Sequence, residues 1–376
     1  MAEVNQVASS TPVPGVVPPE LAEVRPGENL DWVRLEAYLR EHIAELHGAF
    51  EVLQFPNGSA NLTYLLRFGG TELVMRRPPF GAIAPGAHDM KREFRVLSRL
   101  WKFFDKAPRA YVFCDDHDVV GSDFVVMERR VGEVVRFAIP ESMRHHDRVG
   151  HRMGLALTDA MAELHLLDPV ACELADLGKP EGFTARQVSG WKTRWDLVRP
   201  DQPNGRMSAS AIASATAMDE IHAELERTRP APTRVSFVHN DLKPDNCQFR
   251  PEDPDHVGAI FDWDMTTVGE PLVDVGTLLS YWPDPSDSPE SARGTPGLAD
   301  LGLPTRAEIA ERYASRTGAS LADIAWYEAF ALWKTGVVVQ QLHHRWVNGD
   351  STDPRMQFVA DRIVTLVAGA RHLLSL

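Results

Sequence analysis

The chain of 376 residues carries 39 Lys and Arg against 53 Asp and Glu, for a formal net charge of −14. Hydrophobic residues make up 44% of the chain and charged residues 24%, which is the balance of a globular protein with ample material for a core. The acidic balance argues against nucleic-acid binding, which needs a basic surface. No apolar run reaches the roughly 18 residues that a membrane-spanning helix needs, so we expect no membrane insertion.

The N-terminal segment and the cysteines bear on the compartment. Residues 1–30 hold five prolines among small and polar residues and lack the basic and apolar stretches of a secretory signal. Such a segment predicts a mobile tail. Cys114, Cys172 and Cys247 lie far apart and form neither a disulfide framework nor a zinc spacing. We therefore expect a reducing compartment, the cytoplasm.

After this tail, residues 31–130 are predicted to form a small, strand-rich lobe. A helix is expected to begin after Asn29, and a second helix is expected over residues 88–104, where apolar residues recur at helical spacing. The expected strands cover residues 50–55, 62–68, 72–76, 111–114 and 124–127.

Beyond residue 130 the pattern becomes mostly helical. The expected helices include residues 153–166, 211–227, 306–317 and 321–347, and polar stretches rich in Pro and Gly interrupt them at 199–207 and 283–304. A strand-rich front followed by a larger helical back is the plan of kinase-like folds. The predicted class is α+β, with a cleft between two lobes.

The strongest functional signal is the segment VHNDLKPDN at residues 238–246, followed by FDWD at residues 261–264. Phosphoryl transfer from ATP to an alcohol needs a carboxylate that accepts or orients the hydroxyl proton, and oxygen ligands that hold Mg²⁺. Asp241 can supply the first, and Asn246 and Asp262 the second. The alternative interpretation is that the loop residues only stabilise a turn and that Asp262 is a surface carboxylate.

The spacing within this segment predicts a hairpin. Residues 246–249 and 258–261 are strand-like, and the residues between them, 251–255, favour a turn. An antiparallel hairpin closed there would place Asn246 opposite Asp262, with Cβ atoms about 5 Å apart. Two such side chains could share a cation.

These residues resemble the catalytic loop and metal-binding segment of the aminoglycoside phosphotransferase/choline kinase superfamily. Within it, the chain is most similar to the kinase-like proteins that are fused to, or work beside, acyl-CoA dehydrogenases. The stretches that carry the resemblance are residues 54–64, 74–79, 88–93, 126–129, 238–246 and 262–274. The resemblance runs from about residue 30 to the C-terminus. It implies a protein-kinase-like fold, with a nucleotide-binding lobe at 31–130, and a helical lobe at 131–376 that holds the catalytic loop and the acceptor site.

The resemblance implies several nucleotide-binding residues in the first lobe. Asn57, Gly58, Ser59 and Asn61 would lie over the ATP phosphates, although a plain hairpin turn is an alternative interpretation of this loop. Residues 127–130 would form the hinge that holds the adenine, with Met127, Glu128 and Arg130 as the contacting residues.

In related kinases a strand Lys contacts the phosphates and pairs with a Glu on a helix. Here Glu93 fits the helical Glu, because it shares a helix face with Leu97 and Leu100. The strand position is Arg76, which keeps the charge but changes the geometry. This departure puts catalytic strength in doubt, though not nucleotide binding.

Other residues of the motif have open roles. Lys243 could steady the transferred phosphoryl group or only cap the loop. Asp264 could bind a second cation, assist substrate orientation or be an exposed carboxylate. The resemblance implies that Asp274 braces the catalytic loop. His239 is interpreted as a packed scaffold residue, and Cys247 as a small buried hydrophobe.

The acceptor side is less specified. Residues 186–195 and the late helix resemble parts of the lobe that shapes the acceptor pocket. Lys192, Arg194, Lys334 and Arg345 favour an anionic acceptor, such as a hydroxyacyl-CoA, over a cationic aminoglycoside.

The sequence thus predicts an ATP- and Mg²⁺-dependent phosphotransferase that acts on a small-molecule hydroxyl. The resemblance suggests a hydroxyacyl-CoA or hydroxy acid as acceptor and an acyl-CoA dehydrogenase as partner. The alternatives are an aminoglycoside- or choline-type kinase, or a catalytically silent nucleotide-binding partner of an acyl-CoA dehydrogenase. A protein kinase is disfavoured, because Asn240 replaces the usual Arg and Asp-Trp-Asp replaces Asp-Phe-Gly.

Overall fold

The computed structural model describes most of the chain as two compact units. The described residues are 20–44, 46–56, 61–81, 89–135, 138–200, 209–287, 293, 297–351 and 353–376. The first unit comprises Met1–Phe94 and Ala110–Arg129, and the second comprises Arg95–Arg109 and Arg130–Leu376. Residues 95–109, which the sequence assigned to the first lobe, thus group with the second unit.

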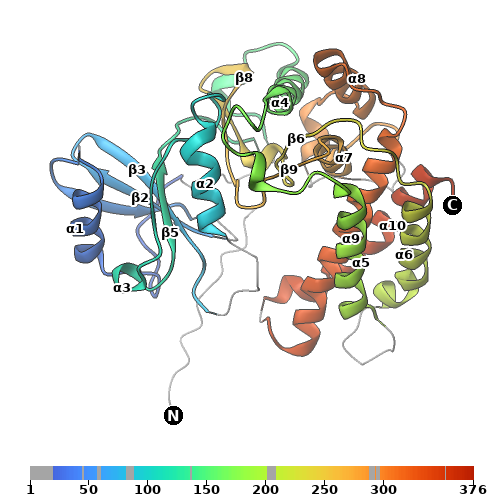
Figure 1. The fold of residues 1–376 in the computed structure, drawn as a ribbon, viewed down its shortest axis with the longest axis horizontal. Helices are drawn as coiled ribbons and strands as arrows, with labels where there is room; N and C mark the ends of the chain where they lie inside the picture. Colours follow the sequence, from blue (N-terminus) through green and yellow to red (C-terminus); the bar gives the residue numbers. More distant parts are fainter. Residues whose placement is uncertain are drawn as a thin grey trace. The chain divides into compact units, whose positions relative to one another are not determined.

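The first unit is built on one antiparallel sheet (Figure 1), whose five strands follow the order β1-β2-β3-β5-β4. The strands are β1 Phe50–Gln54, β2 Leu62–Phe68, β3 Thr71–Arg77, β4 Ala110–Cys114 and β5 Phe124–Glu128. The helices are α1 Trp32–His42, α3 His117–Val120 and the first residues of α2 Met90–Leu100. All five predicted strands are present, whereas α2 is shorter than the predicted helix because the chain turns after Leu100.

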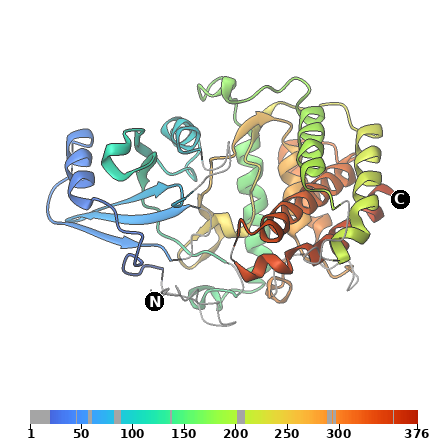
Figure 2. The same ribbon diagram turned by 90° about the horizontal axis from the view of Figure 1, so that it is seen from below.

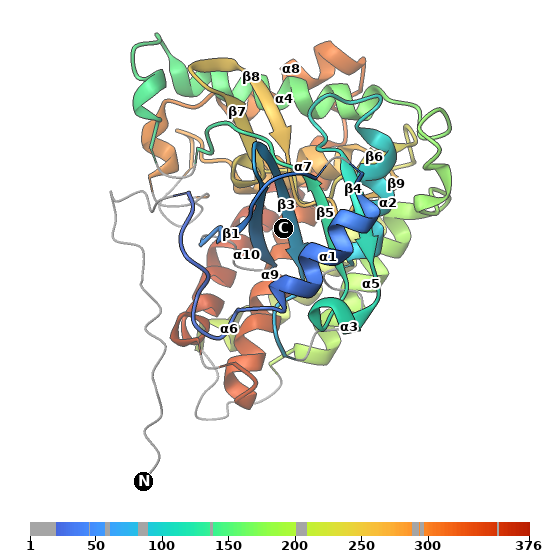
Figure 3. The same cartoon turned by 90° about the vertical axis from the view of Figure 1, so that its left-hand side faces the viewer.

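The side chains of each strand point alternately to the two faces of this sheet. Leu73 and Met75 of β3 lie in a core that α1 covers with Leu35 and Leu39 (Figure 3). Successive side chains of a strand point to opposite faces, so Arg76 lies on the other face.

The segment before α1 is attached to this sheet. Ala22 pairs with Gln54 through backbone hydrogen bonds of 2.9 and 2.8 Å, and the Tyr64 hydroxyl donates to the Glu28 carbonyl at 2.8 Å. Residues 22–28, which the sequence placed in a mobile tail, are therefore bound to β1 and β2. Residues 1–19 of that expected tail lie outside the described residues.

The second unit is mainly helical (Figure 2). Its helices are α4 Val149–Leu166, α5 Phe183–Val198, α6 Ala209–Arg227, α7 Leu272–Tyr281, α8 Arg306–Thr317, α9 Ile324–Asn348 and α10 Arg362–Leu374. The long helix α9 packs against α5, α6, α7 and α10. Two short antiparallel ladders complete the unit: β6 Ser236–Val238 with β9 Thr267–Gly269, and β7 Cys247–Arg250 with β8 Asp253–Ile260. The predicted α+β class is confirmed.

Helix α7 was not predicted from the sequence, and its burial explains why. Nine of its ten residues are buried, so its sequence LVDVGTLLSY has no polar face from which a helical period could be read. Its Gly276 allows close packing, since a Cβ there would lie 2.4 Å from the backbone of Tyr327 in α9. No helix in the described part of the chain combines the length and apolar character that a bilayer crossing demands.

Candidate active site

The segment 239–246 connects the two short ladders of the second unit. Strand β6 directly precedes His239, and its residues Phe237 and Val238 are fully buried. On the other side of the loop, the Phe261 backbone N–H donates to the Asn246 carbonyl at 2.9 Å. The loop that carries Asp241 therefore lies beside the segment that carries Asp262.

A buried carboxylate holds the start of this loop. Asp274 of α7 accepts hydrogen bonds from the backbone N–H groups of His239 at 2.6 Å and Asn240 at 2.7 Å. Burial opposes the charge of Asp274, yet its pKa lies below the ordinary value because the His165 ring, at 3.2 Å, and the loop amide stabilise the carboxylate. These contacts match the bracing role that the resemblance implied.

Asn240 is held in a conformation that few residues adopt. Its φ is 71°, in the left-handed region that Asn tolerates better than most residues. Its side-chain Nδ2 donates to the Met265 carbonyl at 2.8 Å, while its backbone N–H binds Asp274. The turn that presents Asp241 is thus fixed from two sides.

We expect Asp274→Asn to destabilise the protein by about 2–4 kcal/mol, because the buried loop amides would lose their charged acceptor. Urea-induced unfolding at neutral pH would measure this. The exposed Asp300→Asn should change the free energy of unfolding by less than about 0.5 kcal/mol. Equal unfolding midpoints for the two variants would contradict the bracing role.

Asp241 is oriented by two neighbours from its own loop. The Lys243 Nζ atom lies 2.9 and 2.7 Å from its two carboxylate oxygens. The Asn246 Nδ2 atom donates to the Asp241 carbonyl at 2.8 Å and to its carboxylate at 3.0 Å. Burial alone would lower the pKa of Lys243, but the Asp241 carboxylate and Tyr281 raise it, so this Lys carries its positive charge beside the carboxylate.

The expected hairpin is present, but its register differs from the prediction. Cys247 pairs with Ile260, so Phe261 lies opposite Asn246, and Asp262 follows one residue later. The expectation that Asn246 faces Asp262 directly is wrong by one position. The reason is a tight turn at residues 251–252, with β8 starting at Asp253, and two irregularities in the ladder that shift the pairing.

The side chains in this region fit a magnesium ion chemically. Because the Asn246 amide nitrogen binds Asp241, its amide oxygen is directed away from that carboxylate. Asp262 has a φ of 70°, a conformation that turns the chain sharply just after the hairpin. An amide oxygen and a carboxylate are the hard oxygen donors that Mg²⁺ prefers.

The first unit contains the predicted charged pair. Arg76 of β3 forms an ion pair with Glu93 of α2 through Nη1 and Oε1. Glu93 is fully buried and the Arg76 side chain is 12% exposed, so Arg76 is the more exposed partner of the pair. The helical periodicity that placed Glu93 on an inward face thus agrees with the structure.

The remaining candidate nucleotide-binding residues lie in different parts of the chain, and the structure describes only some of them. Asn57, Gly58 and Ser59 lie outside the described residues, and Asn61 is buried directly before β2. Met127 and Glu128 end β5, where Met127 pairs with Val74. Arg130 belongs to the second unit and donates to the Ala107 carbonyl at 3.2 Å.

Two residues beside the catalytic loop were not singled out from the sequence. His165 of α4 is fully buried, with Tyr313 at 2.8 Å from its Nδ1 atom and Asp274 on its other nitrogen. Tyr281 ends α7, and its ring centroid lies 5.6 Å from the Lys243 Nζ atom. His165 continues the line of buried apolar residues Leu157 and Met161 at one-turn spacing in α4, and a His in such a line is a detectable signal, because a buried polar group needs partners.

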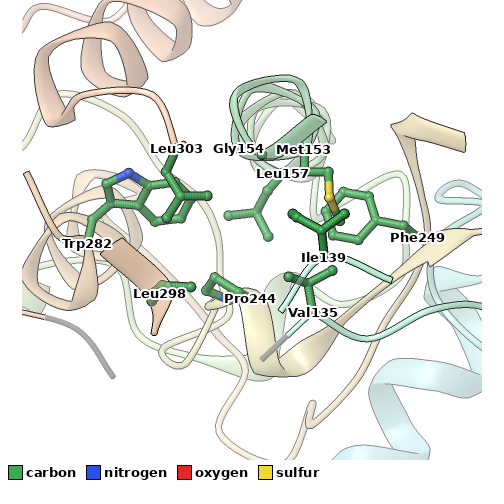
Figure 4. A pocket seen from close by; sticks show the side chains of 11 residues that line it. Val135, Ile139, Met153, Gly154, Leu157, Pro244, Phe249, Trp282, Leu298 and Leu303 are labelled. Carbon is green, nitrogen blue, oxygen red and sulfur yellow. The ribbon is translucent and has the colours of Figure 1, made fainter. Parts of the chain in front are cut away.

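An apolar cavity of about 20 Å³ lies behind the loop at Pro244 (Figure 4). Its lining includes Val135, Met153, Phe249 and Trp282. A space of about one water's size that is lined by apolar side chains offers few polar partners to a ligand or an ordered water. It therefore belongs to the packing that supports the loop.

Comparison with protein families gives a match over most of the chain. The profile of a family described as "Phosphotransferase enzyme family" matches residues 51–329. Acyl-CoA dehydrogenase family member 11 of Rattus norvegicus is 29% identical over 355 residues, which is 92% of this chain and 44% of that protein. Family member 10 of Mus musculus is 29% identical over 329 residues, or 86% of this chain and 29% of that protein. The chain thus spans less than half the length of these relatives.

Solved structures show the same fold. A candidate aminoglycoside phosphotransferase from Ralstonia eutropha is 27% identical and has a TM-score of 0.73, with 92% of this chain and 99% of that chain covered. Spectinomycin phosphotransferase in complex with ADP and spectinomycin is 10% identical, with a TM-score of 0.57 and coverage of 92% and 98%. The GDP complex of aminoglycoside 2′-phosphotransferase-IIIa is 13% identical, with a TM-score of 0.56 and coverage of 91% and 99%.

Proposed function

The chain belongs to the phosphotransferase enzyme family, and on this premise we propose that it transfers a phosphoryl group from ATP, with Mg²⁺, to the hydroxyl of a small molecule. The observation that carries the proposal is the loop at residues 239–246. There a carboxylate oriented by Lys243 and Asn246 lies beside the segment of Asp262, on a backbone braced by a buried Asp274.

Each residue of this loop has a role that its contacts support. Asp241 accepts or orients the proton of the attacking hydroxyl, because it is held by hydrogen bonds and only partly buried. Lys243 offsets negative charge on the transferred group. Asn246 and Asp262 would hold Mg²⁺, which supplies charge neutralisation at the phosphates when it is bound.

In the first unit we assign Arg76 and Glu93 to the phosphate clamp. A guanidinium binds phosphate oxygens as a fork, and the buried Glu93 holds it in one orientation. We assign Asn57, Gly58, Ser59 and Asn61 to the loop over the phosphates, and Met127, Glu128 and Arg130 to the adenine hinge. Two structural relatives were solved as complexes with ADP and with GDP, which supports nucleotide use.

We propose a hydroxyacyl-CoA or a related hydroxy acid as the acceptor. The support is that the relatives are named acyl-CoA dehydrogenase family members. Phosphorylation turns a hydroxyl into a good leaving group, so a phosphorylated acyl group could undergo elimination next to a dehydrogenase. An acyl-CoA dehydrogenase is accordingly the proposed partner. An aminoglycoside- or choline-type acceptor is the second candidate, and the names of two structural relatives, an aminoglycoside and a spectinomycin phosphotransferase, favour the aminoglycoside type.

ADP release over a panel of acceptors tests the function. The panel contains hydroxy acids, their coenzyme A thioesters, choline and amino sugars, each with ATP and Mg²⁺. We expect turnover with the hydroxyacyl compounds and none with choline. Turnover with choline or amino sugars alone would support the second candidate. ATP binding without turnover of any acceptor would instead indicate a silent nucleotide-binding partner.

Removing the charged pair of the first unit should weaken ATP binding. We expect the double variant Arg76→Met/Glu93→Gln to lower ATP affinity by about tenfold or more, because a charge-assisted contact to phosphate is lost. Neutralising both residues avoids leaving a buried, unpaired Glu93. Calorimetric titration with ATP and Mg²⁺ provides the measurement, with Arg76→Lys as the control that keeps the charge. Wild-type affinity in the double variant would remove this pair from the nucleotide site.

A further inference from the structure

Two cations of the second unit share one buried aromatic ring. Trp191 of α5 is 7% exposed, and the Arg194 guanidinium lies 4.3 Å from its ring centroid. The Lys334 Nζ atom of α9 lies 5.5 Å from the centroid of the same ring. Within the described ranges, neither cation forms an ion pair with a carboxylate.

Lys334 also contacts the catalytic loop. Its Nζ atom donates to the carbonyl of Asn240, the residue directly before Asp241, in a long hydrogen bond of 3.4 Å. Lys334 interrupts a helix whose neighbouring positions 329–333 are all buried and mostly apolar. Its ammonium group therefore contacts the peptide group that joins Asn240 to Asp241.

Charged groups of both signs surround Lys334. Burial lowers the pKa of Lys334, and the positive charges of Arg194 and Lys243 lower it further. The carboxylates of Asp241 and Asp274 oppose this lowering of the pKa, although the direct hydrogen-bond partners of both lie elsewhere. Asp241 binds Lys243, and Asp274 accepts from the loop amides.

The other cations that the sequence suggested for the acceptor pocket are arranged differently. Lys192 forms an ion pair with Asp196, one turn further along α5. Arg345 is an exposed residue near the end of α9. Like charges held together without a counterion are costly, and an anion bound between them would offset that cost.

This inference rests on the proposed function and deepens it. We propose that Lys334 and Arg194, on the ring of Trp191, form the acceptor subsite that binds an anionic group of the substrate next to Asp241. The anion could be the carboxylate of a free hydroxy acid or a phosphate group of its coenzyme A thioester. A cationic amino sugar does not fit such a subsite, because it would meet two positive charges.

Binding without turnover tests the subsite directly. The probes are hexanoate, hexanoyl-CoA and the neutral methyl hexanoate, none of which has a hydroxyl to phosphorylate. By calorimetry we expect the wild type to bind one of the two anionic probes at least about tenfold more tightly than the ester. Lys334→Met and Arg194→Met should each lower that affinity about tenfold or more, and Lys334→Arg should retain most of it. The exposed Arg227→Met, whose partner is Glu224, is the control and should bind as the wild type does.

The pattern of affinities identifies the source of the anion. Tight binding of hexanoate assigns the subsite to a carboxylate, and tight binding of hexanoyl-CoA alone assigns it to the coenzyme A phosphates. Equal binding of all three probes, or unchanged affinities in both Met variants, would overturn the subsite.

Turnover separates this proposal from the function on which it rests. For a hydroxy acid or hydroxyacyl-CoA that the wild type phosphorylates, Lys334→Met should raise the KM of that acceptor about 10- to 100-fold and change kcat less. If Lys334 only positioned the loop, kcat would fall equally for anionic and neutral acceptors, and the subsite would be refuted. Hexanoate or hexanoyl-CoA binding that depends on Lys334, with no acceptor phosphorylated by the wild type, would refute the proposed function and leave the subsite standing.

Discussion

Replacing Asp241 with Asn is expected to lower acceptor phosphorylation by about 10²- to 10⁴-fold while ATP affinity stays close to that of the wild type. The amide has nearly the shape of the carboxylate but cannot accept the hydroxyl proton. It also loses the ion pair with Lys243, whose Nζ atom lies 2.7 Å from Asp241 Oδ2. Initial rates of ADP release at saturating acceptor, together with an ATP titration, would measure both effects.

A matched control for this variant lies in the same loop. Asp245 is exposed and precedes Asn246, so Asp245→Asn removes the same charge from a neighbouring position. We expect it to keep most of the activity. If Asp241→Asn turned over acceptors as fast as Asp245→Asn, Asp241 would not be the residue that handles the hydroxyl proton.

The second large effect is expected at Asp262. Asp262→Asn should lower ATP affinity in the presence of Mg²⁺ by about tenfold or more, towards the affinity measured without the metal, because a neutral amide binds Mg²⁺ far more weakly than a carboxylate. Asn is a better replacement than Ala here, because the backbone at this position has a φ of 70°. Asn adopts this left-handed conformation with less strain than Ala does.

ATP titrations with and without Mg²⁺ provide the measurement for Asp262. The thermal unfolding midpoint of the variant, compared with that of the wild type, checks that the hairpin remains folded. An unchanged dependence of ATP affinity on Mg²⁺ would refute the metal assignment. It would then leave Asp262 as a residue of the turn after β8.

The two variants probe different steps, and their results can be separated. In the proposed mechanism Asp241 acts on the hydroxyl of the acceptor, whereas Asp262 acts on the nucleotide, through the metal. A loss of acceptor turnover with intact ATP binding at Asp241, and a loss of metal-dependent ATP binding at Asp262, would together support a phosphotransferase. A wild type that turns over no acceptor, combined with a loss of metal-dependent ATP binding in Asp262→Asn, would favour the silent nucleotide-binding partner.

Much of the first unit could be predicted from local pattern. The five strands were expected close to their observed bounds, because alternation of apolar residues is a local property of a strand in a sheet with a buried face. The inward position of Glu93 followed from the helical period of α2 in the same way. The end of α2 was harder to predict, since Trp101 and Phe104 continue the period although the chain has already turned.

The catalytic segment was predictable in kind but not in register. Residue types and spacing indicated a carboxylate, an amide and a second carboxylate on a loop and hairpin. The irregular ladder between β7 and β8 then moved Asp262 one residue past the position opposite Asn246. A bulge depends on how two strands pack against their surroundings, so the residue pattern within either strand does not predict it.

The sequence by itself determined which chemical groups are present and how they follow one another along the chain: the loop with Asp241, Lys243 and Asn246, the carboxylate at Asp262 and the strand Arg76. Only the tertiary structure decided which groups from distant segments meet them. Asp274 of α7 braces the loop and is itself held by His165 of α4, and Lys334 and Arg194 meet on one indole ring. The physical reason is that periodicity and turn chemistry are local, whereas a hydrogen bond or ion pair across the fold depends on how helices pack after the chain has collapsed.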